Sequence, residues 1–469
     1  MYAWYRTEYL FSATVFARTE QSISEHAREI PVLLYHGALS ATDGANVSRR
    51  TFAEQMFALK RAGYETVTLA EFDAFLDGRI ELPDRSILLT FDDGRKDSFY
   101  PVDPVLHALD YKGVEFVITG HSLGKGNEKI PYYLSKDELS MMVKTGRWEL
   151  ASHSRNAHGV HQVGSNGEEG HNLSNARWIE NEHRLETVKE YMARIDDDLR
   201  GAQADLKESL GVETTAFAFP FGDFGEESKN MPNAEKILRD ITGKIYKRAF
   251  YQTWGGDGES HNRPGKNILM VRRINVSPDW TGEDLVSVVE AGHTKNLPYE
   301  GTFTNVYDWR RLWGDTVVDN GLAFEGSSDS GNAAVFLNGS SLWKDYRIDA
   351  SVNVLKGVTF SVFARLKDNN NFVTCNFKDG RIQIEERVSG DGRVLGTKTA
   401  ISVKQGMHNF GLRVRHNAIV CTLDGHDVFD TDNVSKHLSL GGVGFGAGGL
   451  QKGKDSVLVK SVHITALSK

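Results

Sequence analysis

Two adjacent carboxylates, Asp92 and Asp93, follow a short apolar run in the stretch Ser86-Ile-Leu-Leu-Thr-Phe-Asp-Asp-Gly94. A run of this length that stops at a turn signal is typical of a buried parallel strand. In α/β sheets and barrels, chemistry collects at the carboxyl ends of such strands. Two carboxylates there are costly to bury unless a metal ion or an arginine compensates them. The stretch therefore indicates either a metal-binding strand end or a solvated Asp-Asp-Gly turn.

Two histidines, His153 and His158, follow the strand-like run Trp148–Ser152. On an α-helix they would lie about 140° apart, but a loop leaving a strand can bring both to one point. Two imidazoles and one carboxylate, with coordination positions left open, are typical of a catalytic Zn²⁺ or similar divalent site. Such a metal lowers the pKa of bound water towards ~7, and a second carboxylate can act as general base. The alternative is a pair of polar surface histidines.

A third strand-like run, Thr215–Phe221, ends in Pro220-Phe221-Gly222. The Asp-Asp-Gly turn, the two histidines and this Pro-Phe-Gly segment, in that order, resemble the first three motifs of the NodB-homology polysaccharide deacetylases (carbohydrate esterase family 4). The resemblance covers about residues 30–291. It implies a distorted (β/α) barrel and the metal-dependent removal of acetyl groups from N-acetylated sugars.

The resemblance also implies roles for individual residues. Asp92 would be the catalytic base. The ligands of one divalent metal, Zn²⁺ first and Co²⁺ or Ni²⁺ as alternatives, would be Asp93, His153 and His158.

The Pro220-Phe221 segment would meet the substrate, and the Phe221 backbone N–H would stabilise the oxyanion. His36 ends the first predicted strand and is the expected general acid for the leaving amine. His293 follows the last predicted helix, roughly where most of the family keeps a late histidine, and is the alternative acid.

The sequence departs from the family pattern in two informative ways. The histidine spacing is five residues, where most of the family has four, and together with Leu34-Tyr35-His36 this is similar to the poly-β-1,6-N-acetylglucosamine deacetylases of biofilm exopolysaccharides. Ala218 stands where the third motif usually begins with arginine. An arginine normally orients the base carboxylate and stabilises its charge, and Arg273 is the candidate replacement.

The elements that would position these residues divide the chain into domains. Strands alternate with helices in about seven or eight units over residues 30–291, which favours a barrel over an open sheet. An extension, 1–29, precedes it, and a polar linker, 292–305, follows. Residues 306–469 show short alternating strands with Asp-Gly turns, which predict an all-β jelly-roll sandwich.

The predicted sandwich resembles laminin-G and concanavalin-type domains, many of which bind glycans. Its aromatic residues could form a sugar-stacking face or fill the core: Trp309, Trp313, Trp343 and Tyr346. Ca²⁺ on the Asp- and Asn-rich turns is a further hypothesis without a loop signature. Cys375 and Cys421 could form one disulfide or remain two buried thiols.

The composition of the chain limits the classes of molecule that it is expected to bind. The 469 residues carry 55 basic and 63 acidic side chains, a net charge of −8, without a dense basic cluster, so nucleic acid and anionic membranes are unexpected partners. No apolar run reaches the length of a transmembrane helix. Leu10–Ala17 faintly resembles a signal segment but is short and follows Glu8, so cleavage there is not expected. No feature specifies an oligomeric state.

The leading hypothesis is a metal-dependent N-deacetylase acting on an N-acetylglucosamine polysaccharide of the biofilm type, outside the cytoplasm. The same site could act on peptidoglycan, chitin or O-acetylated xylan. A hypothesis of another class is an inactive polysaccharide-binding protein, motivated by Ala218 and by Val276, which replaces an aspartate of the family's fourth motif.

Overall fold

The computed structural model describes residues 26–124, 132–253, 259–301, 303–326, 331–355, 357–451 and 457–467. The predicted extension, 1–29, with its Leu10–Ala17 segment, therefore lies outside the described residues except for its last four positions. The chain forms two compact units, and the change from the first to the second falls between Val286 and Ser287. That point lies within helix α10 (Gly282–Gly292), ahead of the predicted linker.

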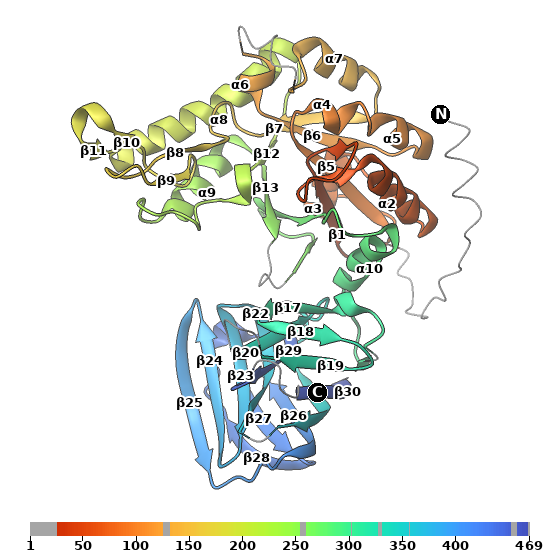
Figure 1. Ribbon diagram of the computed structural model, residues 1–469, viewed down its shortest axis with the longest axis vertical. Helices are drawn as coiled ribbons and strands as arrows, with labels where there is room; N and C mark the ends of the chain where they lie inside the picture. The colour runs from red at the N-terminus through yellow and green to blue at the C-terminus, as the bar shows by residue number, and fades with distance from the viewer. Residues whose placement is uncertain are drawn as a thin grey trace. The chain divides into compact units, whose positions relative to one another are not determined.

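Seven parallel strands close into a barrel in the first unit (Figure 1). In chain order they are β1 (Ile30–Tyr35), β5 (Ser86–Asp93), β6 (Gly113–Val117), β7 (Trp148–Ser152), β12 (Ala216–Ala218), β13 (Arg248–Thr253) and β15 (Met270–Asn275). Strand β1 pairs with both β5 and β15, which closes the ring. Two short strands extend its margin: β4 (Glu65–Thr66) and β14 (His261–Asn262). The predicted barrel is confirmed, with seven strands.

Apolar strands and amphipathic helices account for the core of this unit. All six residues of β1 and the first seven of β5 are buried, as expected of strands covered on both faces. The helices are α2 (Arg49–Arg61), α3 (Leu69–Leu76), α4 (Lys96–Phe99), α5 (Asp103–Leu109), α6 (Thr119–Ser122), α7 (Lys136–Lys144), α8 (Val188–Leu210), α9 (Ala234–Ile245) and α10. Helix α8 buries residues at steps of three and four: Tyr191, Ile195, Leu199, Ala202 and Leu206.

The stretch between β7 and α8 contains strands that the sequence did not predict. They form two small hairpins: β8 (Val160–Gln162) with β9 (Glu169–His171), and β10 (Trp178–Ile179) with β11 (Arg184–Leu185). Strands of two or three residues are too short to show a periodicity. Helix α8 begins only after these hairpins, because Arg184–Leu185 pairs as β11 and Thr187 caps the helix with Glu190.

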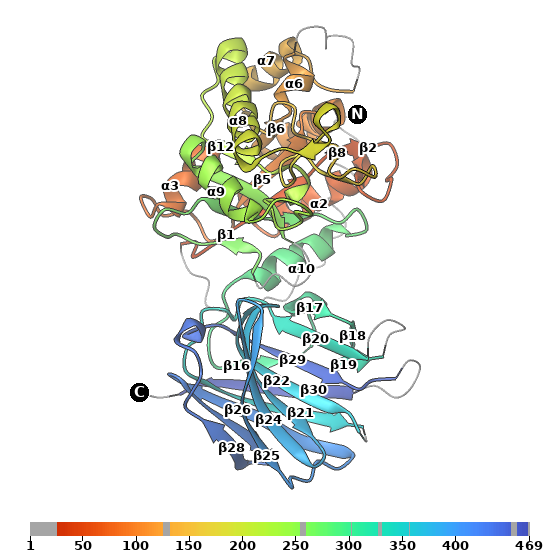
Figure 2. The ribbon, with the colours of Figure 1, turned by 90° about the vertical axis from the view of Figure 1, so that its left-hand side faces the viewer.

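The second unit contains two antiparallel sheets (Figure 2). One has the order β17 (Trp309–Trp313), β20 (Asn332–Leu337), β29 (Gly442–Gly448), β22 (Thr359–Asp368), β23 (Asn371–Lys378), β24 (Arg381–Val388), β25 (Asp391–Thr399). The other has the order β18 (Asp315–Val318), β19 (Leu322–Glu325), β30 (Val457–Ala466), β21 (Tyr346–Val354), β26 (Gly406–Arg415), β27 (Ala418–Leu423), β28 (His426–Thr431), with β16 (Tyr299–Gly301) beside β30. Alternate residues of both sheets share one hydrophobic core.

Two open questions from the sequence are resolved here. Trp309, Trp343 and Tyr346 are at most 6% exposed, so they fill the core, whereas Trp313 is half-buried. Cys375 on β23 and Cys421 on β27 form a disulfide that joins the two sheets.

None of the helices in the described part of the chain combines the length and apolar character that crossing a membrane requires.

Candidate metal and active site

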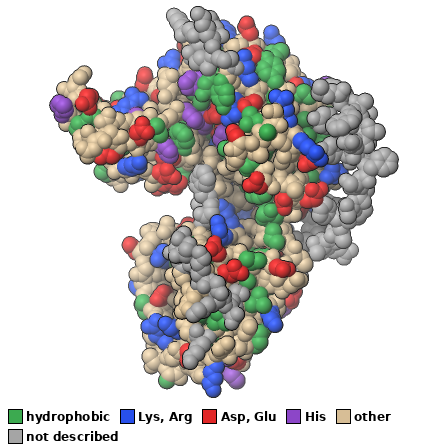
Figure 3. Space-filling view, viewed as in Figure 1, with side chains coloured by type: hydrophobic (Ala, Val, Ile, Leu, Met, Phe, Trp, Pro, Cys, Tyr) green, Lys and Arg blue, Asp and Glu red, His purple; other side chains and the backbone are tan. Residues whose placement is uncertain are grey.

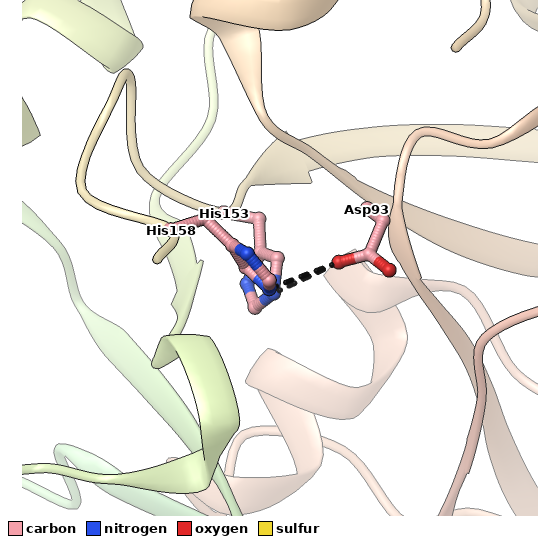
Figure 4. A group of neighbouring side chains, drawn as sticks. All are labelled: Asp93, His153 and His158. Carbon is pink, nitrogen blue, oxygen red and sulfur yellow. Dashed lines mark ion pairs between the residues drawn. The ribbon is translucent and has the colours of Figure 1, made fainter. Parts of the chain in front are cut away.

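Asp93, His153 and His158 converge at the carboxyl ends of the barrel strands (Figure 4). Asp93 ends β5 and His153 follows β7; these strands flank β6, so their ends lie at the same rim of the barrel. Nε2 of His158 lies 3.2 Å from Oδ1 of Asp93, and Nε2 of His153 lies 3.6 Å from the same oxygen. Both imidazoles thus point toward one carboxylate oxygen.

These three side chains fit a divalent metal ion. Oδ1 of Asp93 is buried and receives no hydrogen bond of normal geometry from the described residues. Nδ1 of His153 lies 2.8 Å from the carbonyl oxygen of Ala218. A carbonyl only accepts, so Nδ1 carries the proton and Nε2 offers its lone pair to a metal. Two nitrogen donors and one oxygen donor leave coordination positions open, as in catalytic zinc sites.

The protonation states of two of these side chains suit metal binding. Burial raises the pKa of Asp93, but the neighbouring His158 and His153 lower it by a larger amount. The pKa of Asp93 therefore lies well below its ordinary value. Burial lowers the pKa of His153 to about 4. The carboxylate is therefore ionised and this imidazole neutral at pH 7, the forms that bind metals.

Arg273 of β15 holds Asp92 by two hydrogen bonds. Its Nη1 and Nη2 donate to Oδ1 and Oδ2 of Asp92 at 2.6 and 2.8 Å. The two side chains are 0% and 1% exposed. Burial raises the pKa of Asp92, but the charges of Arg273 and His153 overcome this effect and leave the pKa below its ordinary value. The arginine absent at Ala218 thus has a counterpart on another strand.

Two further residues that the sequence reasoning missed support the turn after β5. Glu115 of β6 is fully buried and accepts hydrogen bonds from the backbone N–H of Gly94 (2.8 Å) and from the Ser98 hydroxyl (2.9 Å). Burial raises the pKa of Glu115 well above its ordinary value. Arg95 pairs with Asp97 and approaches the Asp93 carboxylate at 3.9 Å. The sequence does carry a signal for Glu115, because it is a single glutamate inside an otherwise apolar strand.

Each of the three motif turns contains a non-glycine residue with left-handed backbone. Asp93, Ser154 and Phe221 have φ of 81°, 71° and 61°. Such conformations are unfavourable for residues other than glycine and cluster at functional sites. The clustering at one rim of the barrel supports a site there.

Three rings in contact wall the site on one side: Phe221 stacks on His171 and lies tilted against His158. Phe221, which is 36% exposed, lies between His158 at 4.7 Å and His171 of β9 at 4.4 Å between ring centroids. Nδ1 of His171 lies 2.7 Å from Oδ2 of the buried Asp223, which fixes the ring. His171 was missed because β9 is so short. Figure 3 shows histidine side chains gathered beside hydrophobic ones on one face of this unit.

The remaining residues predicted for the site are the substrate-contacting Pro220 and the two candidate acids, His36 and His293. Pro220 is buried beside Phe221. His36 follows β1 and is half-buried, and its charge is among those that lower the pKa of both Asp92 and Asp93. His293 follows α10 and belongs to the second unit. The structure therefore brings His36 near the two carboxylates.

Comparison with known proteins agrees with this geometry. Residues 79–237, which include the Asp-Asp-Gly turn, both histidines and Phe221, match the family model "Polysaccharide deacetylase". The chain contains a polysaccharide deacetylase domain. Three strands outside the matched range, β1, β13 and β15, complete its barrel.

This deacetylase domain has homology to poly-β-1,6-N-acetyl-D-glucosamine N-deacetylases. The chain is 26% identical to that of Staphylococcus aureus (strain MSSA476) over 251 residues, 54% of this chain and 74% of the relative. It is 28% identical to that of Escherichia coli (strain K12) over 194 residues, 39% of this chain and 29% of the relative. A solved de-N-acetylase of Aggregatibacter actinomycetemcomitans is 19% identical, with a TM-score of 0.47 over 54% of this chain and 96% of its own.

Proposed function

We propose that this chain is a metal-dependent hydrolase that removes N-acetyl groups from a poly-β-1,6-N-acetylglucosamine-like exopolysaccharide. One observation carries the proposal: the Asp93–His153–His158 group lies beside the Asp92–Arg273 pair at the rim of the deacetylase barrel. Nε2 of His153 is 3.7 Å from Oδ2 of Asp92, so a base and a set of metal donors share one point. The names of the relatives favour this polymer over peptidoglycan, chitin and acetylated xylan.

In this mechanism Asp93, His153 and His158 would hold one divalent ion, Zn²⁺ first, with Co²⁺ or Ni²⁺ as alternatives. When bound, the ion would lower the pKa of water and polarise the acetamide carbonyl. Asp92 accepts the proton of the attacking water, and Arg273 fixes the direction of its carboxylate.

Other residues of the rim handle the oxyanion and the leaving group. The backbone N–H of Phe221 donates to the carbonyl oxygen as its charge develops. His36 then donates a proton to the nitrogen of the departing amine. We prefer His36 to His293 for this role because its charge acts on both Asp92 and Asp93.

The contact between Phe221 and His171 supports a position for the sugar. Asp223 holds the His171 ring through Nδ1, so the opposite, Nε2 edge of the ring is the one we assign to a substrate hydroxyl. The exposed Phe221 ring offers an apolar surface beside it. We assign His171 as a positioning residue. An extracellular, periplasmic or cell-surface location suits this substrate, and the Cys375–Cys421 disulfide supports it.

Acetate release from a panel of polymers tests the proposal. The panel contains poly-β-1,6-N-acetylglucosamine, chitin oligosaccharides, peptidoglycan and acetylated xylan, each with and without a chelator. The expected result is chelator-sensitive release from the first polymer above the others. A protein without divalent metal and without acetate release on any polymer would instead favour an inactive polysaccharide-binding role.

A further inference from the structure

The seven-stranded sheet of the second unit carries a groove of about 400 Å³ on the face opposite the core. On β22, Phe360 and Val362 point into the core, so Ser361 between them points outward. The same alternation turns Asn376 of β23 and Gln383 of β24 to the outer face. The polar side chains of the groove therefore all belong to the outer face of this sheet.

Strand register places the polar residues of the groove in one row. Gly446 pairs with Ser361, Ser361 with Asn376, and Asn376 with Gln383. Neighbouring strands lie about 4.8 Å apart, so the row crosses four strands at regular intervals. The Ser361 hydroxyl and the Asn376 amide oxygen lie 2.6 Å apart, which fixes both side chains. Hydroxyl and amide groups in a row offer both hydrogen-bond donors and acceptors.

The floor of the groove depends on β29. A Cβ at Gly446 would come within 3.0 Å of the Phe363 ring, and a Cβ at Gly448 within 2.7 Å of Oδ1 of Asn332. Side chains at these positions would fill the space above the sheet. The half-buried Trp313 packs edge-on against Phe363, with 6.0 Å between ring centroids, and supplies an aromatic wall.

Charges at one part of the groove favour an uncharged ligand or an acidic one. Lys378 of β23 and Arg381 of β24 lie opposite one another in the strand register, and both side chains are exposed. Glu385 is the acidic residue of the lining, and its Oε1 accepts a hydrogen bond from Gln383 at 2.7 Å. Two cations against one anion give an excess of positive charge. A protonated amine is therefore disfavoured relative to a neutral acetamide.

We propose that this groove binds an acetylated saccharide chain and binds it more tightly than its deacetylated product. Hydroxyl and amide groups beside an aromatic wall match sugar hydroxyls and acetamides. A peptide strand would need a free sheet edge, but β22 and β23 are paired on both sides. A folded protein partner would bury an apolar centre, whereas this one is polar. Only the identity of the polymer rests on the proposed function.

Equilibrium binding to the full chain tests this site. The parent protein carries Asp92→Asn, so that the polymer is not consumed, and the probes are poly-β-1,6-N-acetylglucosamine and its chemically deacetylated form. Asn376→Ala with Gln383→Ala should weaken binding of the acetylated polymer at least fivefold. Lys378→Glu with Arg381→Glu should shift the preference at least fivefold toward the deacetylated form.

Asn353→Ala is the matched control, because this asparagine is also half-buried but lies on β21 of the other sheet. It should leave binding unchanged. Unchanged affinity in the Asn376/Gln383 variant, with an unchanged melting temperature, would overturn the site, and unchanged preference in the charge variant would overturn its selectivity. Acetate release by the protein with Asp92 intact is measured separately, so that loss of one proposal does not decide the other.

Discussion

Arg273 and Asp92 lie 181 residues apart in the sequence and form a doubly hydrogen-bonded ion pair inside the barrel. Neither side chain reaches solvent, because they are 0% and 1% exposed. The pair therefore serves two purposes in one place. It stabilises a buried charge, and it fixes the orientation of the carboxylate that we propose as the base.

Removing one partner of this pair should cost stability. Arg273→Ala leaves the Asp92 carboxylate buried without its hydrogen-bonded partner, which costs about 3–5 kcal/mol. The pKa of Asp92 should then rise, because burial would no longer be opposed by the arginine charge. Chemical denaturation measures the loss. The double variant Arg273→Met with Asp92→Asn should regain most of it, and a double variant as unstable as Arg273→Ala would contradict this account.

Loss of a proposed metal ligand should be separable from loss of fold. Asp93→Ala and His158→Ala should each reduce bound divalent metal from about one per chain to near zero, because three ligands are needed to hold a catalytic ion. Metal analysis of the purified proteins measures this change. His426→Ala on the exposed end of β28 is the control and should bind metal normally. Full metal content in both ligand variants would refute the assignment.

Part of this site follows from the sequence, for a physical reason. Asp92, Asp93 and His153 each stand at or next to the end of an apolar strand, and a closed parallel barrel brings such ends to one rim. Arg273 was a candidate because β15 is a barrel strand, but its contact depends on side-chain direction inside the barrel.

Other parts were not predicted. Glu115 and Arg95 act on the turn after β5 through contacts that no motif encodes. His171 reaches the site on a three-residue strand, which has no periodicity to detect. The sandwich strands were predicted from alternation, whereas the pairing of the two cysteines depended on how two sheets face one another.

Glu115 should matter through its hydrogen bonds and not through its charge. Glu115→Gln keeps an acceptor for the Gly94 N–H and should preserve stability and turnover. Glu115→Ala leaves that N–H and the Ser98 hydroxyl without this partner, at a cost of about 1–3 kcal/mol. Denaturation and acetate release compare the two variants. Equal losses in both would show that the negative charge is required.

The pH dependence of stability gives a second test of Glu115. Burial raises the folded-state pKa of this carboxyl, so between the ordinary and the raised pKa the folded protein holds more protons than the unfolded chain. Stability from this group is therefore present below the ordinary pKa and declines as the pH rises. The Gln variant should lack this component. A wild-type protein whose stability falls with pH no faster than that of Glu115→Gln would contradict the raised pKa.

His171 should affect substrate binding more than the chemical step. His171→Ala removes the ring that stacks on Phe221 and should raise KM several-fold on the polymer while bound metal stays unchanged. Asp223→Asn should have a smaller effect in the same direction, because it loosens the ring without removing it. His183→Ala, at an exposed position on the same stretch, is the control. A fall in kcat alone, with KM unchanged, would reassign His171 to the chemistry.

The disulfide should stabilise the second unit alone. Cys375 and Cys421 are separated by 46 residues, and closing a loop of that size is worth about 4 kcal/mol on a chain-entropy estimate. Cys375→Ala with Cys421→Ala should lower the melting temperature of the sandwich, because the cross-link between its sheets is lost. Metal content of the barrel should not change, since its proposed ligands all belong to the first unit. Calorimetry with metal analysis measures both, and a sandwich transition unaffected by the substitutions would show that packing of the shared core suffices.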